Sequence, residues 1–305
     1  MINDLDGAVI GGGPDTGDYS GKGGDVTIAC GTGNCINHGF IAGASGLGDA
    51  RLSLRSGQAD TRTLDGSGGK VTITGAGNFQ NVPKNGGARP IIKGGDGASA
   101  MADGHDLQGR GAAGGDVEVR FDANNITNSG AINPGAYGFP NPDKRKAKIK
   151  LNGAAVDKLG FLGKNLDGTA VAAVVEVVGR DSITVQVGDD VQGETVSFTT
   201  ADGGTILFAD PTPNSHGKVR AQERVSLSTG PHGTVDMRQV NGREGGEYEA
   251  IIVLDEQGRV GTIQVEPFFL DDDCTCDDVV GRIVLGCRAD FNQDGFLDFF
   301  DYDDF

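Results

Sequence analysis

A short glycine-led motif recurs three times in the first half of this chain, and its spacing constrains the possible folds more than any other feature. Residues 23–28 read Gly-Gly-Asp-Val-Thr-Ile, residues 68–73 read Gly-Gly-Lys-Val-Thr-Ile, and residues 114–119 read Gly-Gly-Asp-Val-Glu-Val. The copies therefore start 45 and then 46 residues apart. A fixed period of this length is typical of solenoids and other arrays in which one structural unit stacks on the next.

A second strand-like segment that begins with Ala recurs in residues 50–54, 88–92 and 147–151. Residues 1–155 show no sustained helical periodicity, and their apolar runs are short, β-branched and end at Gly or Asn. We therefore predict an all-β, Gly-rich, right-handed β-helix or solenoid, with roughly two coils in each repeat unit. A propeller blade has a similar length, but three units do not close a ring.

One stretch of this first half resembles a known family. Residues 126–133 read Ile-Thr-Asn-Ser-Gly-Ala-Ile-Asn, and residues 36–41 alternate in the same way around Asn, His and Gly. The stretch at 126–133 resembles the coils of filamentous-haemagglutinin-type and autotransporter β-helices. The resemblance implies a β-helix in the first half of the chain.

The second half is also rich in strand-like runs but lacks the glycine-pair motif. Runs come about every ten residues between 171 and 240, and they indicate either further coils or a packed sandwich. Residues 248–254 and 260–265 flank a turn-like segment and predict an antiparallel hairpin that caps the solenoid edge. We therefore predict three regions: Gly-rich solenoid repeats in 1–155, a β-rich continuation or second β-domain in 156–270, and an acidic tail in 271–305.

The charge of the chain limits its partners. The formal net charge is −17, and residues 271–305 hold eleven Asp and two Arg. Nucleic acid is not an expected partner, because phosphate binding needs clustered Lys and Arg. No apolar stretch approaches the length of a membrane span. Residues 1–6 are acidic and lack the apolar region of a signal peptide, so we expect a mature or trimmed form of a secreted or cell-surface protein.

The five cysteines leave three alternatives open: disulfides, buried thiols and metal ligands. Cys30 and Cys35 are close enough in sequence to close a small loop, whereas Cys274, Cys276 and Cys287 cluster before the C-terminus. An odd number leaves one thiol without a partner inside the chain. Zinc is the weakest alternative, because a fourth ligand at suitable spacing is missing. Disulfides would indicate an oxidising compartment.

The clearest chemical motif lies at the C-terminus. Residues 290–301 read Asp-Phe-Asn-Gln-Asp-Gly-Phe-Leu-Asp-Phe-Phe-Asp, with oxygen-bearing side chains at loop positions one, three, five, nine and twelve. Gly295 stands at position six, where the backbone of an EF-hand-type loop turns sharply, and Leu297 is the apolar anchor at position eight. Calcium needs six to eight oxygen ligands, so this spacing predicts a calcium site.

Residues 287–305 resemble the dockerin-like calcium segments of secreted planctomycete proteins, which combine a Cys, a D-F-N-x-D-G loop and an F-F-D helix start. By this resemblance the metal ligands are Asp290, Asn292, Asp294, Asp298 and Asp301, together with the backbone carbonyl of Phe296. The family implies a cohesin-like partner, although a full dockerin has two such loops and this chain has one. The alternative is a single calcium staple that orders the tail, with the aromatic residues of 299–305 packed locally or forming a docking surface.

Catalytic motifs are not evident. Residues 109–114 match G-x-G-x-x-G but precede a strand instead of a helix, and the four His share no metal-ligand spacing. Asp103, Asp106 and Asp116 are carboxylates of the type that β-helix polysaccharide lyases and hydrolases use, but the sequence does not place them on one face. The balance therefore favours a role without catalysis.

We predict an extracellular structural or adhesive protein of the cell surface or matrix that forms fibres by end-to-end stacking. Its expected partners are further copies of itself, a surface protein or a polysaccharide. The alternative is a carbohydrate-active β-helix enzyme carried to its substrate by the dockerin-like tail. A flat flank rich in Gly and Asn with strand contacts between subunits favours the fibre, and a groove lined with paired carboxylates and exposed aromatic side chains favours the enzyme.

Overall fold

The part of the chain that the computed structural model describes is built of β-strands. The described residues are 2–5, 8–10, 20–21, 23–48, 67–97, 113–137, 147–163, 174–186, 188–209, 218–230, 232–236, 247–253, 262–264 and 281–286. They form 23 strands and no helix; 21 strands join one sheet, and two form a separate antiparallel pair, β3 (Ser20–Gly21) with β7 (Leu47–Gly48). The all-β prediction is confirmed for this part.

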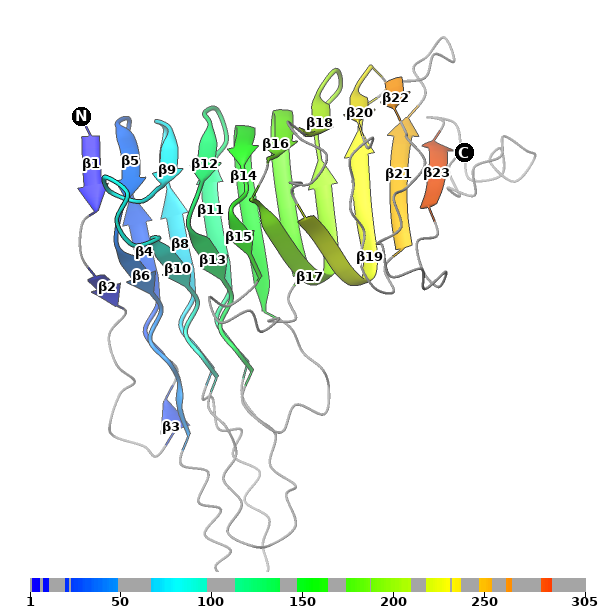
Figure 1. Ribbon diagram of the computed structural model, residues 1–305. Helices are drawn as coiled ribbons and strands as arrows, with labels where there is room; N and C mark the ends of the chain where they lie inside the picture. Colours follow the sequence, from blue (N-terminus) through cyan, green and yellow to red (C-terminus); the bar gives the residue numbers. More distant parts are fainter. Residues whose placement is uncertain are drawn as a thin grey trace, which may run out of the picture.

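The strands of the large sheet pair in parallel and make three ladders, named A, B and C here. Figure 1 shows the strands following one another in chain order along the length of the molecule. Ladder A contains β4 (Val26–Ala29), β8 (Val71–Thr74), β11 (Val117–Phe121), the first halves of β14 (Lys148–Lys158) and β16 (Val174–Val185), the second halves of β17 (Asp190–Thr199) and β19 (Lys218–Thr229), β21 (Glu247–Val253) and β23 (Gly281–Gly286).

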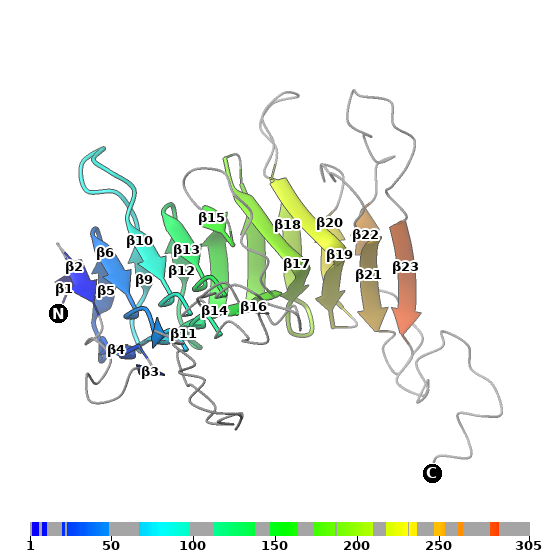
Figure 2. The ribbon, with the colours of Figure 1, turned by 90° about the horizontal axis from the view of Figure 1, so that it is seen from below.

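Ladders B and C follow the same order. Ladder B contains β1 (Ile2–Leu5), β5 (Asn34–Asn37), β9 (Phe79–Asn81), β12 (Ile126–Asn128), the second halves of β14 and β16, β18 (Thr205–Phe208), β20 (Thr234–Asp236) and β22 (Thr262–Gln264). Ladder C contains β2 (Ala8–Ile10), β6 (Phe40–Ala42), β10 (Ile91–Lys93), β13 (Ala131–Asn133), β15 (Phe161–Leu162) and the first halves of β17 and β19. Figure 2 shows β6, β10, β13 and β15 side by side.

One repeat unit corresponds to one passage of the chain through ladders A, B and C, which we call a coil. Val26 pairs with Val71, and Val71 pairs with Val117, so neighbouring copies of the motif are neighbouring strands. The prediction of roughly two coils in each unit is therefore wrong. The extra length lies in the connection from ladder C back to ladder A, which begins after Ala42 in the first complete coil and ends at Val71.

The predicted second strand is not one repeated position. Residues 91–93 form β10 in ladder C, whereas residues 148–153 belong to ladder A, where Ile149 pairs with Val117 of the motif strand. The third predicted copy, 50–54, lies outside the described residues. Alternation of apolar side chains is the same in every strand of a two-faced sheet, so the pattern alone does not distinguish the ladders.

The predicted antiparallel hairpin over 248–254 and 260–265 is also wrong. β21 pairs in parallel with β19 and β23, and β22 pairs in parallel with β20. The two strands therefore belong to different ladders. The division of the chain at residue 155 stays a prediction; β14 crosses that position and continues from ladder A into ladder B.

The core lies on the inner side of the three ladders. Along many of the strands buried and less buried residues alternate, as in Val71–Thr74 and Val117–Phe121. Inner-row residues of the successive strands of ladder A are 0–1% exposed: Val71, Val117, Ile149, Val175, Val196 and Val225. The rings of Phe79 and Phe121 stack with centroids 5.2 Å apart, and they join ladders A and B inside one apolar cluster. This arrangement is compatible with the predicted solenoid.

Candidate functional site

The predicted calcium loop, residues 290–301, lies outside the described residues, as do Cys274, Cys276 and Cys287. Calcium binding by Asp290, Asn292, Asp294, Phe296, Asp298 and Asp301 therefore stays a prediction. Within the described ranges no group of three or more His, Cys, Asp or Glu side chains is arranged to hold a metal ion. The candidate functional features among the described residues are the polar, charged and glycine contacts between neighbouring coils.

Asp116, one of the three carboxylates considered for catalysis, accepts a hydrogen bond from the backbone N–H of Lys148 in the next coil, at 2.8 Å. Asp25 does the same for the N–H of Lys70, at 2.7 Å. The Asp of the repeat motif thus connects the starts of neighbouring ladder A strands. Asp103 and Asp106 lie outside the described residues.

Charged side chains on the outer face of ladder A pair across coils. Lys70 Nζ lies 2.7 Å from Glu118 Oε2, and Lys150 Nζ lies 3.9 Å from Glu176 Oε2. The hydrogen bond from Lys70 lowers the pKa of Glu118, because it stabilises the carboxylate form. These pairs place opposite charges in neighbouring strands, and such pairs help to set the register of a sheet.

A column of buried asparagines runs through the ends of three ladder B strands. Asn37, Asn81 and Asn128 are 1%, 0% and 0% exposed. Asn37 Nδ2 donates to Asn81 Oδ1 at 2.8 Å, and Asn81 Nδ2 donates to Asn128 Oδ1 at 2.7 Å. Asn128 Nδ2 then donates to the backbone carbonyl of Leu159 in the fourth coil. The amides therefore all point the same way along the stack, and each satisfies its buried neighbour.

Beyond Asn128, the buried polar side chain at this corner is Asp189. Its carboxylate accepts hydrogen bonds from the backbone N–H groups of Leu159, Gly160 and Gln186, at 3.1, 2.8 and 2.8 Å. Burial raises the pKa of Asp189, although the three N–H donors oppose that shift. The corner between ladders B and C is thus held by buried polar side chains over the first five coils.

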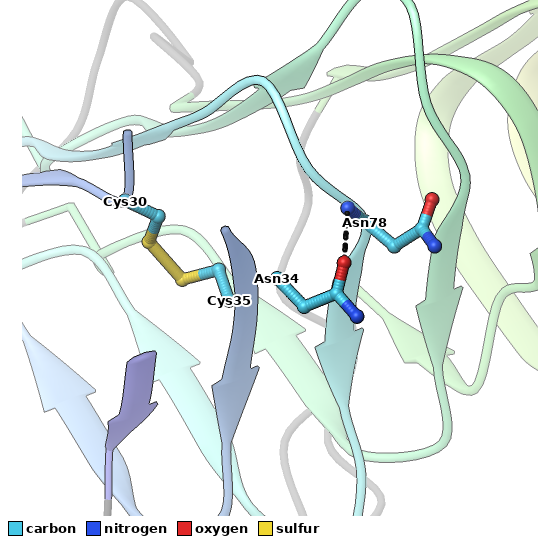
Figure 3. Close-up of a disulfide and its surroundings, with 4 residues drawn as sticks. All are labelled: Cys30, Asn34, Cys35 and Asn78. Carbon is cyan, nitrogen blue, oxygen red and sulfur yellow. Dashed lines mark hydrogen bonds between the residues drawn. A yellow bond between two sulfur atoms is a disulfide. The ribbon is translucent and has the colours of Figure 1, made fainter. Parts of the chain in front are cut away.

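A second asparagine column lies three residues earlier, at the start of the same three ladder B strands. The backbone N–H of Asn78 donates to Asn34 Oδ1 at 3.1 Å (Figure 3), and the N–H of Asn125 donates to Asn78 Oδ1 at 3.1 Å. These side chains are exposed or half-buried. The spacing Asn-x-x-Asn at 34–37, 78–81 and 125–128 is the sequence signal of both columns, and the sequence predictions above do not include it.

Glycine makes a comparable stack between the segments that leave ladder C and those that enter ladder A. Successive members of this glycine stack are joined by backbone N–H···O hydrogen bonds of 2.8–3.0 Å: Gly24, Ala44, Gly69, Gly95, Gly115 and Gly135. A Cβ atom on Gly69 of the repeat motif would lie 2.0 Å from the backbone oxygen of Gly24, and one on Gly95 would lie 1.9 Å from that of Ala44. The repeat motif therefore needs glycine because backbones of neighbouring segments approach too closely to leave room for a side chain, and not only because glycine favours turns.

The outgoing segments also bond to each other at three-residue intervals. Gly43 and Gly46 donate their N–H groups to the carbonyls of Lys93 and Asp96 in the next coil, at 3.0 and 2.8 Å. A three-residue interval is that of an extended polyproline II-type chain, in which glycine allows close lateral packing. The described residues at the corner between ladders C and A are thus rich in closely packed glycine.

The corner between ladders A and B carries a histidine–carboxylate pair in the later coils. His232 Nδ1 lies 3.0 Å from Asp202 Oδ1, and the backbone N–H of His232 donates to the same oxygen at 2.9 Å. The hydrogen bond from the backbone N–H, followed by that from the ring, lowers the pKa of Asp202. Both side chains are more than half exposed, and they stabilise one turn against the next.

The disulfide prediction is confirmed for one pair. Cys30 and Cys35 are bonded and close the turn between β4 and β5 (Figure 3). Among the described residues no helix has the length and apolar character needed to cross a membrane. No protein-family model, curated protein or solved structure matches this chain. Its function must therefore be inferred from the geometry above.

Proposed function

We propose that this protein is an extracellular structural or adhesive β-solenoid of the right-handed β-helix type, and that its copies associate into fibres. The observation that carries the proposal is the regular stacking of the coils, seen in the asparagine columns of ladder B and the glycine stack beside ladder A. Both consist of like residues stacked on like residues. Regular coils can stack end to end, and head-to-tail contacts of that kind generate filaments.

The described carboxylates support the same function. Glu118, Asp116 and Asp189 each hold a cation or a backbone N–H group of another coil. Retaining and inverting glycosidases both need a pair of carboxyl groups on either side of the scissile bond. The contacts of these three acids support a role in holding neighbouring coils in register. The Cys30–Cys35 disulfide is compatible with an oxidising, extracellular setting.

The C-terminal segment fits this proposal as a calcium-binding, dockerin-like tail that attaches the solenoid to a cohesin-like protein or another surface partner. The ligand set is that implied by the sequence resemblance. Attachment by a tail leaves the flanks of the solenoid accessible to further copies or to a polysaccharide.

Electron microscopy of the purified protein in calcium tests this function. Ladder A has nine strands, and at about 4.8 Å per strand a single copy is a rod of roughly 4 nm. Filaments several times longer, formed at rising protein concentration, are the expected result. Separate rods of single-copy length that cleave a polysaccharide would contradict the proposal and support the enzyme.

A further inference from the structure

The Cys30–Cys35 disulfide closes one corner of the first complete coil. Cys30 follows β4 at the end of its ladder A strand, and Cys35 lies within β5 in ladder B. The two side chains are 5% and 0% exposed. Their backbone N–H groups donate to Thr74 and Asn78 of the next coil, each at 2.8 Å. The bridge therefore ties two ladders together inside the core.

The disulfide also covers the aromatic part of that core. Cys35 pairs with Phe79, whose ring stacks on Phe121 of the third coil. In the second coil the same corner holds Gly75, where an added Cβ would lie 2.5 Å from the Phe121 ring and 3.2 Å from Cys30 Cβ. The Phe121 ring thus rises through the space left by Gly75, and the two sulfur atoms complete the corner above it.

This corner is supported from one side in ladder A. Among the described strands, β4 pairs with β8 alone, whereas β5 in ladder B pairs with both β1 and β9. Ile28 of β4 is partly exposed, whereas Ile73 and Val119 of the same inner row are 0% exposed. In stacked repeats each unit is held only by its neighbours, so a strand with one neighbour opens more easily than a strand with two.

We propose that the Cys30–Cys35 disulfide is a redox-dependent lock on the first complete coil. When the corner opens transiently and a small dithiol reaches the bridge, the dithiol donates two electrons and two protons, the S–S bond breaks, two thiols form and the dithiol becomes a disulfide. The corner between β4 and β5 then opens, while the later coils stay folded. This lock is independent of the proposed fibre function and would operate equally in an enzyme.

Hydrogen exchange of the calcium-loaded, full-length chain measures the effect. For a bridge with a sequence separation of 5, the lost loop-closure entropy predicts roughly 30-fold faster exchange of the β4 and β5 amides. The change is a Cys30→Ser/Cys35→Ser variant, compared with oxidised wild type. Amides of β16 and β18, which lie several coils away from the bridge, are expected to exchange at wild-type rates.

Two further variants separate the crosslink from other effects. Cys30→Ala/Cys35→Val removes the crosslink but keeps apolar side chains in the inner row. If the crosslink is the lock, this variant must loosen β4 and β5 as the serine pair does. A variant that keeps the bridge and replaces the other three cysteines must not loosen them: Cys274→Ser/Cys276→Ser/Cys287→Ser. Unchanged exchange of β4 and β5, equal loss of protection in every coil, or failure of both bridge variants to fold would each overturn the lock.

Discussion

Replacing Asn81 by alanine removes the middle member of the buried asparagine column. The change deletes the hydrogen bond that Asn81 accepts from Asn37 Nδ2, at 2.8 Å, and the one it donates to Asn128 Oδ1, at 2.7 Å. Of the two atoms that lose a bond, Asn37 Nδ2 keeps the Gly39 carbonyl at 3.3 Å, and Asn128 Oδ1 keeps the Gly130 N–H at 3.1 Å. Two partly unsatisfied groups in the core cost about 1–2 kcal/mol each, so we expect a loss of about 3 kcal/mol.

Asn78→Ala is the matched control, because it changes the same residue type on the same coil three positions earlier. Asn78 Oδ1 accepts the Asn125 N–H at 3.1 Å in an exposed position, so its removal is expected to cost less than about 1 kcal/mol. Urea unfolding followed by circular dichroism measures both. Stacked repeats can unfold in parts, so exchange of the β9 and β12 amides is measured alongside. Equal destabilisation by the two substitutions would refute the assignment of the inner column as the more stabilising one.

The remaining predictions concern the glycine stack, Asp189 and the tail. Gly95→Ala places a Cβ atom within 2.6 Å of backbone atoms in two other segments, so thermal unfolding should show a loss of about 3 kcal/mol or more. Gly86→Ala, with a φ of +75° and open space, should lose about 1 kcal/mol; a similar loss for both would contradict the close-packing argument. The raised pKa of Asp189 means that the folded state binds more protons than the unfolded state just above the usual carboxyl pKa, so stability should fall as pH rises through that window. Asp189→Asn should remove this slope, and an unchanged slope would rule out Asp189 as its source. Asp294→Ala should abolish calcium binding in a calorimetric titration, and a chelator should leave the β-sheet signal of the coils intact; an unchanged titration, or loss of the whole signal, would refute the predicted tail.

The repeat motif predicted the all-β class because its β-branched residues alternate in every copy. The length of a coil was not predictable from the same pattern. The glycines that precede Val71 and Val117 look like turn residues in the sequence, yet Gly69 and Gly115 bond to segments of other coils instead of ending a turn. The sequence therefore predicts too many coils in each unit. The number of coils in a unit depends on backbone contacts between distant segments, and the only local signal of these contacts is glycine itself.

The hairpin prediction over 248–265 was wrong for a related reason. Residues 255–259, Asp-Glu-Gln-Gly-Arg, have the composition of a turn between antiparallel strands. Turn composition shows that the chain leaves a strand, but not which strand the next one joins. In this fold β21 and β22 belong to ladders A and B, and each finds its partner one coil away. Parallel stacking of this kind is a non-local property.

The asparagine columns could have been predicted, because their spacing is regular. Asn37, Asn81 and Asn128 each follow an outer Asn by three residues. Three residues along a strand move a side chain from one face of the sheet to the other, so the first Asn of each pair and the second must differ in burial. Like residues at equal positions in successive units then stack in register. The identity of the partner groups, such as the Leu159 carbonyl, depends on the irregular fourth coil.

Variation between the coils is concentrated at one corner. The connection from ladder C to ladder A spans residues 43–70, 94–116 and 134–147 in three successive coils, while β4 to β5 and β8 to β9 are joined by four residues each. The glycine stack lies at the base of these connections and keeps them in register without side chains. In repeat proteins the insertions of successive units collect on one face, which is often the binding face. We therefore expect an adhesive contact of this protein to involve the corner between ladders C and A, with the buried asparagine corner serving to hold the coils together.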